Sequence, residues 1–229
     1  MADKPSRALV IYADGFAPLV HSHLHSLAAR GSCGFLALRE SEDERMLREL
    51  RQLLDANVPS IPQRFMGMRA AIISLGFNVI DFDHLAKELL KILGFVGEEV
   101  VEAPEFDLVF LHLLLNEMVG WILQSAQPGS CIASRLHLSL VMSYGAIAEI
   151  KSNLTAVFPR QSYTMKGSNI RHHHPMLIAQ WQDAVTRKDA VGEFFFEEFA
   201  KRGACNAILA DRFLHEVAFK LWKAPKYGA

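Results

Sequence analysis

Apolar residues form several short unbroken runs along the chain, and polar or turn-forming residues follow each run. Runs of this length, rich in branched and aromatic residues, are typical of strands buried on both faces of a parallel sheet. The pattern predicts strands at residues 8–13 (ALVIYA), 33–38 (CGFLAL), 106–114, 136–142 and 176–179.

Between these runs, apolar residues recur every three or four positions among charged ones, which is the pattern of amphipathic helices. It predicts helices at 21–30, 42–56, 64–76, 84–93, 117–126, 191–201 and 211–222. Alternating strands and helices indicate an α/β fold, with a mostly parallel central sheet and helices on both of its faces. Because 229 residues suit one sizeable core, we expect residues 1–229 to form a single domain.

Two distant segments repeat the same order of features. Leu27–Leu36 (LAARGSCGFL) and Phe199–Leu209 (FAKRGACNAIL) both run from a helix end through Arg-Gly to a small residue, a cysteine and an extended stretch. Gly31 and Gly203 are predicted to stop their helices in the left-handed conformation that glycine adopts at least cost. Convergent capping chemistry explains the likeness.

Charge and composition exclude several classes of partner. The 24 basic residues nearly cancel the 25 acidic ones, so no overall field attracts nucleic acid or an anionic membrane. Three widely spaced cysteines without a C-x-x-C pair favour a reducing compartment. The chain shows neither a secretory signal nor the ~20 apolar residues that span a bilayer. We expect a soluble, cytoplasmic or nuclear protein that binds neither nucleic acid nor membrane.

Nucleotide-binding and serine-hydrolase motifs are absent from the sequence: there is no G-x-x-x-x-G-K-[ST], no G-x-G-x-x-G and no G-x-S-x-G. His21, His23 and His25 are two residues apart in a predicted helix, whereas ligands of one metal need a spacing of three or four. We interpret them as surface or capping residues. One histidine of the run 172–174 can be a ligand at a strand edge.

Asp14 directly follows the first predicted strand. The carboxyl ends of parallel strands border the ligand crevice of an α/β sheet, so Asp14 is the strongest single candidate for chemistry. A helix cap or turn explains the same residue equally well. The other residual candidates for catalysis are His112, Glu117 and His172.

Taken together, several stretches resemble the archaeal-type cofactor-independent phosphoglycerate mutases of the alkaline phosphatase superfamily. They are LVIYADGFA, HLHSLAARGSCGFL, MRAAIISLGFNVIDFDHLAKELLKILGF, which is similar to the family's central helical pair, FDLVFLHLLLNEMVGW, LSLVMSYGA, RHHHPMLIA and the C-terminal FFFEEFAKRGACNAILADRFLHEVAFKLW. The resemblance implies an alkaline-phosphatase-like core, and the short chain implies that the cap or lid insertion is absent. It also implies an ancestral two-metal phosphoryl-transfer site, in which charged ligands are essential.

Position by position, the ligands that the resemblance implies are partly replaced. Asp14 matches the first metal Asp, and His112 and Gly120 match the second strand end. Asn116 stands where the family has Asp, Trp121 where it has His, and Ser143-Tyr144 where it has an Asp-His pair; His172 or a neighbour keeps the last histidine. Neutral Asn, Ser, Tyr and Trp side chains are poor ligands for hard divalent cations.

These replacements predict a non-catalytic phosphatase-fold protein, a pseudoenzyme without cofactor that acts as a protein-interaction or scaffold subunit. Trp121, Phe213, Leu214, Val217 and Trp222 are the expected partner-binding residues, because aromatic side chains are good interface anchors. Core packing is the alternative fate of such an apolar stripe. Self-association into a homo-oligomer is also compatible with the sequence.

Two alternatives remain open. The first is a diverged phosphohydrolase or phosphomutase that keeps a reduced site with one divalent metal, Mn or Zn, and uses Asp14 and a histidine for acid–base chemistry. The second is a sensor of a phosphorylated small molecule, with Arg160, Lys166 and Arg171 as the anion-binding residues.

Overall fold

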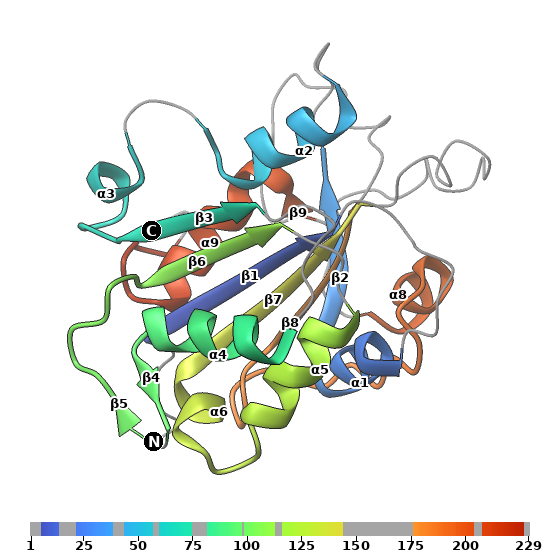
Figure 1. Ribbon diagram of the computed structural model, residues 1–229. Helices are drawn as coiled ribbons and strands as arrows, with labels where there is room; N and C mark the ends of the chain where they lie inside the picture. The colour runs from blue at the N-terminus through green and yellow to red at the C-terminus, as the bar shows by residue number, and fades with distance from the viewer. Residues whose placement is uncertain are drawn as a thin grey trace.

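A seven-stranded sheet crosses the molecule in the strand order β3-β6-β1-β7-β8-β2-β9 (Figure 1). In this computed structural model the described residues are 6–13, 22–38, 44–56, 60–74, 82–97, 99–112, 116–143, 176–203 and 208–226. The strands of the sheet are β1 (Arg7–Ala13), β2 (Ser32–Ala37), β3 (Ala70–Ser74), β6 (Leu108–His112), β7 (Leu136–Met142), β8 (Met176–Trp181) and β9 (Ile208–Leu209). The short strands β4 (Phe95–Val96) and β5 (Glu99–Val100) pair separately.

Most neighbouring strands run parallel, as the unbroken apolar runs predict. The β3-β6, β6-β1, β1-β7 and β2-β9 pairs are parallel, whereas β8 is antiparallel to both β7 and β2. Every residue of β1 and β7 is buried, which requires cover on both faces. The prediction of an α/β fold with a mostly parallel sheet is therefore confirmed.

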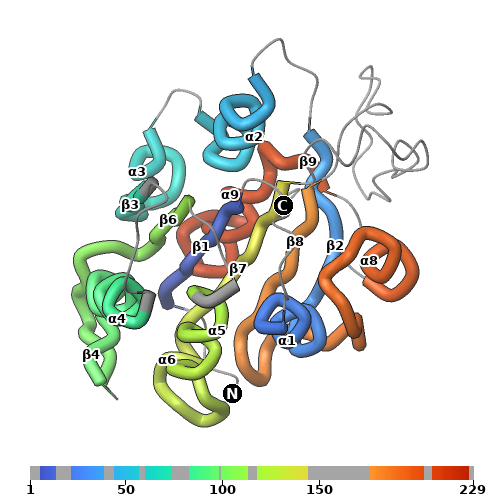
Figure 2. Tube along the Cα trace, turned by 45° about the vertical axis from the view of Figure 1, so that its right-hand side comes forward, coloured from blue at the N-terminus to red at the C-terminus, as the bar shows by residue number. Residues whose placement is uncertain are grey.

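Helices cover the two faces of the sheet and enclose two separate apolar cores. The helices are α1 (Ser22–Arg30), α2 (Arg45–Leu53), α3 (Ile61–Arg64), α4 (Phe82–Ile92), α5 (Asn116–Ser125), α6 (Cys131–Arg135), α8 (Phe196–Arg202) and α9 (Ala210–Lys220). Residues of α1, α4, α5, α6 and α8 pack against one face, and residues of α2 and α9 pack against the other. Figure 2 shows α9 behind the sheet when α1, α4 and α5 lie in front.

The predicted helix at 64–76 is wrong. Only Ile61–Arg64 is helical; Met66 and Gly67 then take positive φ, and Ala70–Ser74 forms the edge strand β3. Its residues pair in parallel with β6, from Ala70 beside Leu108 to Ser74 beside His112. Ala and Met favour a helix locally, but the β-branched pair Ile72-Ile73 suits a pleated strand beside another strand.

The left-handed conformation predicted for Gly31 and Gly203 is also wrong, because neither has positive φ. Both glycines are needed for close approach instead. A Cβ on Gly31 would lie 2.5 Å from the Gln180 carbonyl oxygen, and one on Gly203 would lie 2.8 Å from that of Cys33.

The two similar segments that contain these glycines lead into neighbouring strands. β2 and β9 run parallel, and Leu36 pairs with Ile208, which are equivalent positions when the two Arg-Gly steps are aligned. The shared order of features therefore corresponds to two helices, α1 and α8, that are each followed by one strand of the parallel β2-β9 pair.

Within the described part of the chain, none of the helices combines the length and the apolar character needed to cross a bilayer.

Candidate functional site

The carboxyl ends of β1, β6 and β7 lie side by side at one edge of the sheet. Tyr12 of β1 is in register with His112, the last residue of β6, and with Val141 of β7. The backbone N–H of Ser143, directly after β7, donates to the Ala13 carbonyl oxygen at 2.9 Å. This is the edge at which α/β sheets bind ligands, and the sequence places Asp14 and Tyr144 immediately beyond it.

The carboxylate of Glu49, on α2, is buried against the described part of this edge. The Tyr12 hydroxyl donates to Glu49 Oε2 at 2.5 Å, and the Ser143 hydroxyl donates to Glu49 Oε1 at 2.8 Å. Tyr12 and Ser143 are fully buried, and Glu49 is 2% exposed. Each carboxylate oxygen therefore accepts a hydrogen bond from a neutral hydroxyl of the sheet, which is the arrangement that makes burial of a charged group tolerable.

Arg45, one turn before Glu49 on α2, supplies the compensating positive charge. Its Nη1 donates to Ser143 Oγ at 2.7 Å and lies 3.9 Å from Glu49 Oε1. One guanidinium and one carboxylate leave these four residues without net charge. We call Tyr12, Arg45, Glu49 and Ser143 the edge cluster.

His112 borders the edge cluster from β6. It is half-buried, and its ring centroid lies 5.2 Å from that of Tyr12 with the two planes tilted by 39°. His112 is thus a predicted site residue that the fold brings to the carboxyl edge, and it contacts an aromatic face there.

Several predicted site residues fall outside the part of the chain that the structure describes. These residues are Asp14, Tyr144, Arg160, Lys166, Arg171 and His172; Asn116 and Glu117 begin α5, but their side chains are outside the described set. The proposed roles of these residues stay predictions. Within the described ranges, no group of three His, Cys, Asp or Glu side chains is placed to hold a metal ion.

The expected partner-binding residues separate into two kinds. Phe213, Leu214 and Val217 lie in the core between α9 and the sheet and are at most 1% exposed, so core packing accounts for them and they present no surface. Trp121 is 37% exposed and Trp222 is 61% exposed. Only the two tryptophans remain accessible to a partner.

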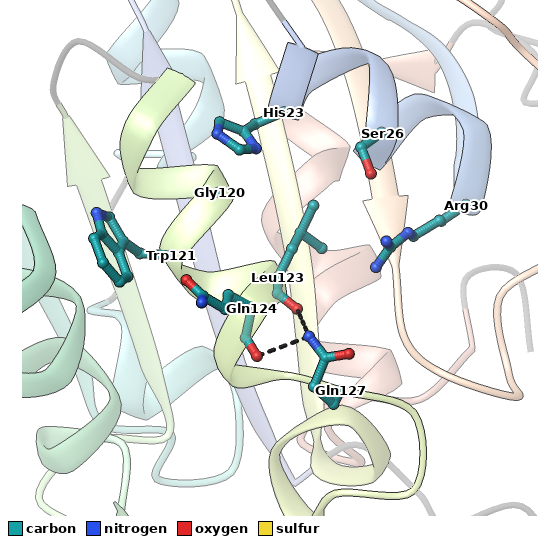
Figure 3. Close-up of a pocket in the computed structure, with 8 residues that line it drawn as sticks. All are labelled: His23, Ser26, Arg30, Gly120, Trp121, Leu123, Gln124 and Gln127. Carbon is teal, nitrogen blue, oxygen red and sulfur yellow. Dashed lines mark hydrogen bonds between the residues drawn. The ribbon is translucent and has the colours of Figure 1, made fainter.

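A cavity of about 320 Å³ lies between α1 and α5 (Figure 3). It is lined by His23, Ser26, Arg30, Gly120, Trp121, Leu123, Gln124 and Gln127. A Cβ on Gly120 would lie 2.7 Å from the His23 ring, so this glycine has a packing role. Figure 3 shows the Trp121 ring on the side of α5 away from α1. Arg30 is exposed and the Gln127 side chain, just after α5, donates to carbonyl oxygens in the last turn of that helix, so the cavity offers few fixed polar groups.

A second buried polar group lies farther from the carboxyl edge, on the same face of the sheet. Lys220 Nζ of α9 donates to Gln180 Oε1 at 2.9 Å, and Gln180 Nε2 lies 3.2 Å from Ser139 Oγ and 3.4 Å from His137 Nε2. Because an ammonium only donates, the amide oxygen must face Lys220 and the amide nitrogen must face His137. His137 Nε2 is therefore an acceptor. We call these four residues the strand cluster.

His137 in the strand cluster is held neutral. Burial lowers its pKa well below the ordinary value, and the nearby positive charge of Lys220 lowers the pKa further. Desolvation disfavours the charged imidazolium, and a proton on Nε2 would face the Gln180 amide donor.

The sequence did not reveal Glu49, Arg45 or Tyr12 as members of a site. In the helix predicted at 42–56, two of the apolar residues, Met46 and Leu47, are 40% and 56% exposed. Glu49 and Leu53, four residues apart, are the buried positions. Glu49 lies one turn before the apolar Leu53, and this spacing is the sequence signal that could have indicated a buried glutamate.

Comparisons with known proteins support the fold. The chain matches no family model and no curated protein. Among solved structures, the PH0037 protein from Pyrococcus horikoshii is similar over 100% of both chains, with 12% sequence identity and a TM-score of 0.58. A cofactor-independent phosphoglycerate mutase from Thermoplasma acidophilum matches 67% of this chain and 37% of its own, at 11% identity and a TM-score of 0.35. The first similarity shows a shared fold, and the second is too loose to carry an argument.

Proposed function

We propose that this chain is a non-catalytic protein with an alkaline-phosphatase-like core, which works by binding a protein partner. Its carboxyl edge serves structure rather than phosphoryl transfer. The relationship to phosphoglycerate mutases rests on the sequence resemblance, and the absence of a cap or lid is part of the same proposal.

The edge cluster is the observation that carries this proposal. A two-metal site needs excess negative charge and carboxylate oxygens that face the cations. At the third strand end, where the resemblance implies an Asp-His pair, the hydroxyl of Ser143 binds Glu49 and Arg45. Both oxygens of Glu49 are hydrogen-bonded, and Arg45 cancels its charge. A cation entering here would meet a guanidinium and would have to displace buried hydrogen bonds.

Metal content and phosphatase activity test the non-catalytic part. The purified protein is incubated with MnCl2 or ZnCl2, desalted and assayed for bound metal, and turnover of p-nitrophenyl phosphate is compared with that of an Asp14→Asn variant. We expect substoichiometric metal and equal background rates in both proteins. Stoichiometric metal with turnover that Asp14→Asn abolishes would overturn the proposal in favour of a diverged phosphohydrolase or phosphomutase.

The proximity of His112 to Tyr12 is the observation that favours this second function. The His112 and Tyr12 rings are in contact at the carboxyl edge, which holds an imidazole at the edge where α/β sheets bind ligands. His112 can act as a general acid or base if substrate reaches it. The sensor function has no support among the described residues and is tested by the shift in melting temperature on adding phosphate or phosphoglycerate.

A further inference from the structure

The two edge strands of the seven-stranded sheet are protected to different degrees. At one edge, β9 has only two residues and leads directly into α9. At the other edge, β3 (AAIIS) has five residues, and none of them is charged or a proline. Figure 1 shows β3 as the outermost strand, beside β6. Short edge strands, charged side chains and proline normally prevent pairing with another chain, so β3 lacks the protection that β9 has.

The backbone of β3 has hydrogen-bonding groups that point away from the sheet. The Leu108 N–H of β6 donates to the Arg69 carbonyl oxygen at 3.1 Å, and Leu108 is in register with Ala70. In such a parallel ladder the odd-numbered residues of β3 bond to β6, and the even-numbered residues Ala70, Ile72 and Ser74 direct their N–H and C=O groups to the other side. No strand of the described ranges lies on that side, so an added strand can bond there.

The side chain of Ile72 is exposed on this strand. Side chains two residues apart share one face of a sheet, and Ala70 packs against the core that α2 and α9 cover. On that face Phe110, in register with Ile72, is 1% exposed, whereas Ile72 is 57% exposed. An uncovered β-branched side chain on an edge strand is suited to a cross-strand pair with a further strand.

The same strand of a second copy complements this edge. When two β3 strands pair antiparallel about a two-fold axis at Ile72, Ile72 faces Ile72 and Ala70 faces Ser74 of the other copy. All these residues direct their backbone groups outward, so each facing pair can exchange two hydrogen bonds.

Charge does not oppose this self-pairing. β3 itself is uncharged, and Arg69, the nearest charged residue before it, is paired with Asp107. Arg69 lies three positions from the axis, so the backbones of its two copies are about 20 Å apart. The formal net charge of the whole chain is −1, which gives little repulsion between copies.

We propose that this chain forms a symmetric dimer through β3, in which Ile72 packs against its own copy and the two sheets become one. An extended segment of a different protein would use the same backbone groups, but the neutral, self-complementary strand favours a second copy. This interface goes beyond the proposed function, which concerns a different protein, and does not rest on it.

Sedimentation equilibrium of the full chain, from about 1 μM to about 100 μM, tests the dimer. Wild type should be dimeric at the upper concentrations. Like charges that face each other across two strands repel, so Ile72→Lys and Ile72→Glu should each raise the dissociation constant at least about tenfold. An equimolar mixture of the two variants should dimerise again, because Lys then faces Glu at the axis.

Val96→Lys is the matched control, because Val96 is a β-branched residue of the short strand β4 and is 54% exposed. It should leave the dimer unchanged. The melting temperatures of the Ile72 variants, measured at about 1 μM, should equal that of wild type, since an exposed side chain adds little to the stability of one copy.

A wild type that stays monomeric at about 100 μM would overturn the proposal, and so would a dimer that survives Ile72→Lys or one that Val96→Lys also removes. Restored dimers in the mixture can form only from folded chains, so they separate loss of the interface from misfolding. A mixture that stays monomeric would show that Ile72 does not face its own copy.

Discussion

Two polar clusters on one face of the sheet each place polar side chains in the protein interior, and they compensate for that burial in different ways. β7 contributes Ser143, after its last residue, to the edge cluster, and it contributes His137 and Ser139 to the strand cluster. In the edge cluster a carboxylate and a guanidinium cancel each other. In the strand cluster the only cation is Lys220, and the buried histidine is neutral.

This difference shows where charge is retained in the protein. The edge cluster keeps a buried carboxylate, paired with the exposed side chain of Arg45, at the position where α/β proteins bind ligands. All described groups there are satisfied internally. In the strand cluster the buried histidine is neutral, and the hydrogen bonds fix the orientation of the Gln180 amide and the tautomer of His137. The comparison predicts that the edge cluster is sensitive to loss of charge, whereas the strand cluster is sensitive to pH.

Removal of the Glu49 carboxylate should have the largest effect. Glu49→Ala leaves the Tyr12 and Ser143 hydroxyls without their acceptor and Arg45 without its counter-charge, so the free energy of unfolding should fall by about 3 kcal/mol. Urea denaturation measures it. Glu44→Ala, at an exposed residue that makes no capping bond, is the control and should change stability by less than about 0.5 kcal/mol. An equally small effect of Glu49→Ala would show that the edge cluster does not stabilise the fold.

A methyl group at Gly31 should disturb the strand cluster through β8. The added Cβ would lie 2.5 Å from the carbonyl oxygen of Gln180, so the backbone must shift. The free energy of unfolding should therefore fall by about 2 kcal/mol. Gly192→Ala is the matched control, because no atom lies within 4 Å of its added Cβ. Equal thermal midpoints of the two variants would contradict close approach at Gly31.

Acid should destabilise the strand cluster through His137. Its folded-state pKa is lowered, so below about pH 6.5 the unfolded chain binds a proton that the folded chain does not. The contribution of neutral His137 to the free energy of unfolding is fully present above that pH. It is lost as pH decreases, by at most about 1.4 kcal/mol per pH unit. Denaturation of wild type and His137→Gln at several pH values measures the difference in slope. An unchanged slope in His137→Gln would remove His137 as the cause, and His84→Gln, at an exposed helix position, controls for general histidine titration.

The sheet was predictable from sequence because its strands are buried on both faces and therefore unbroken in hydrophobicity. β3 was not, since Ala70–Ser74 contains residues that suit a helix locally and becomes a strand only beside β6. β9 has two residues, too few for a pattern. In both cases the deciding interactions are made with strands distant in sequence.

The candidate site was predictable only in part. His112 and Ser143 could be placed at strand ends, because parallel strands end at a common edge. Glu49 could not, because its partners Tyr12 and Ser143 are 37 and 94 residues away and a glutamate on an amphipathic helix is exposed by default. The burial of Phe213, Leu214 and Val217 was likewise undecidable from their stripe alone.

Titration of the protein with Mn²⁺, followed by electron paramagnetic resonance, tests the central claim most directly. Free hexaaqua Mn²⁺ gives a sharp six-line spectrum that tight coordination broadens. We predict that the spectrum of the free ion grows linearly from the first addition, with the same slope for wild type and Asp14→Asn. The contrary result is that no free-ion signal appears until two equivalents have been added to wild type, while Asp14→Asn shows the signal from the first addition. It would contradict the claim that the carboxyl edge does not hold a pair of metal ions.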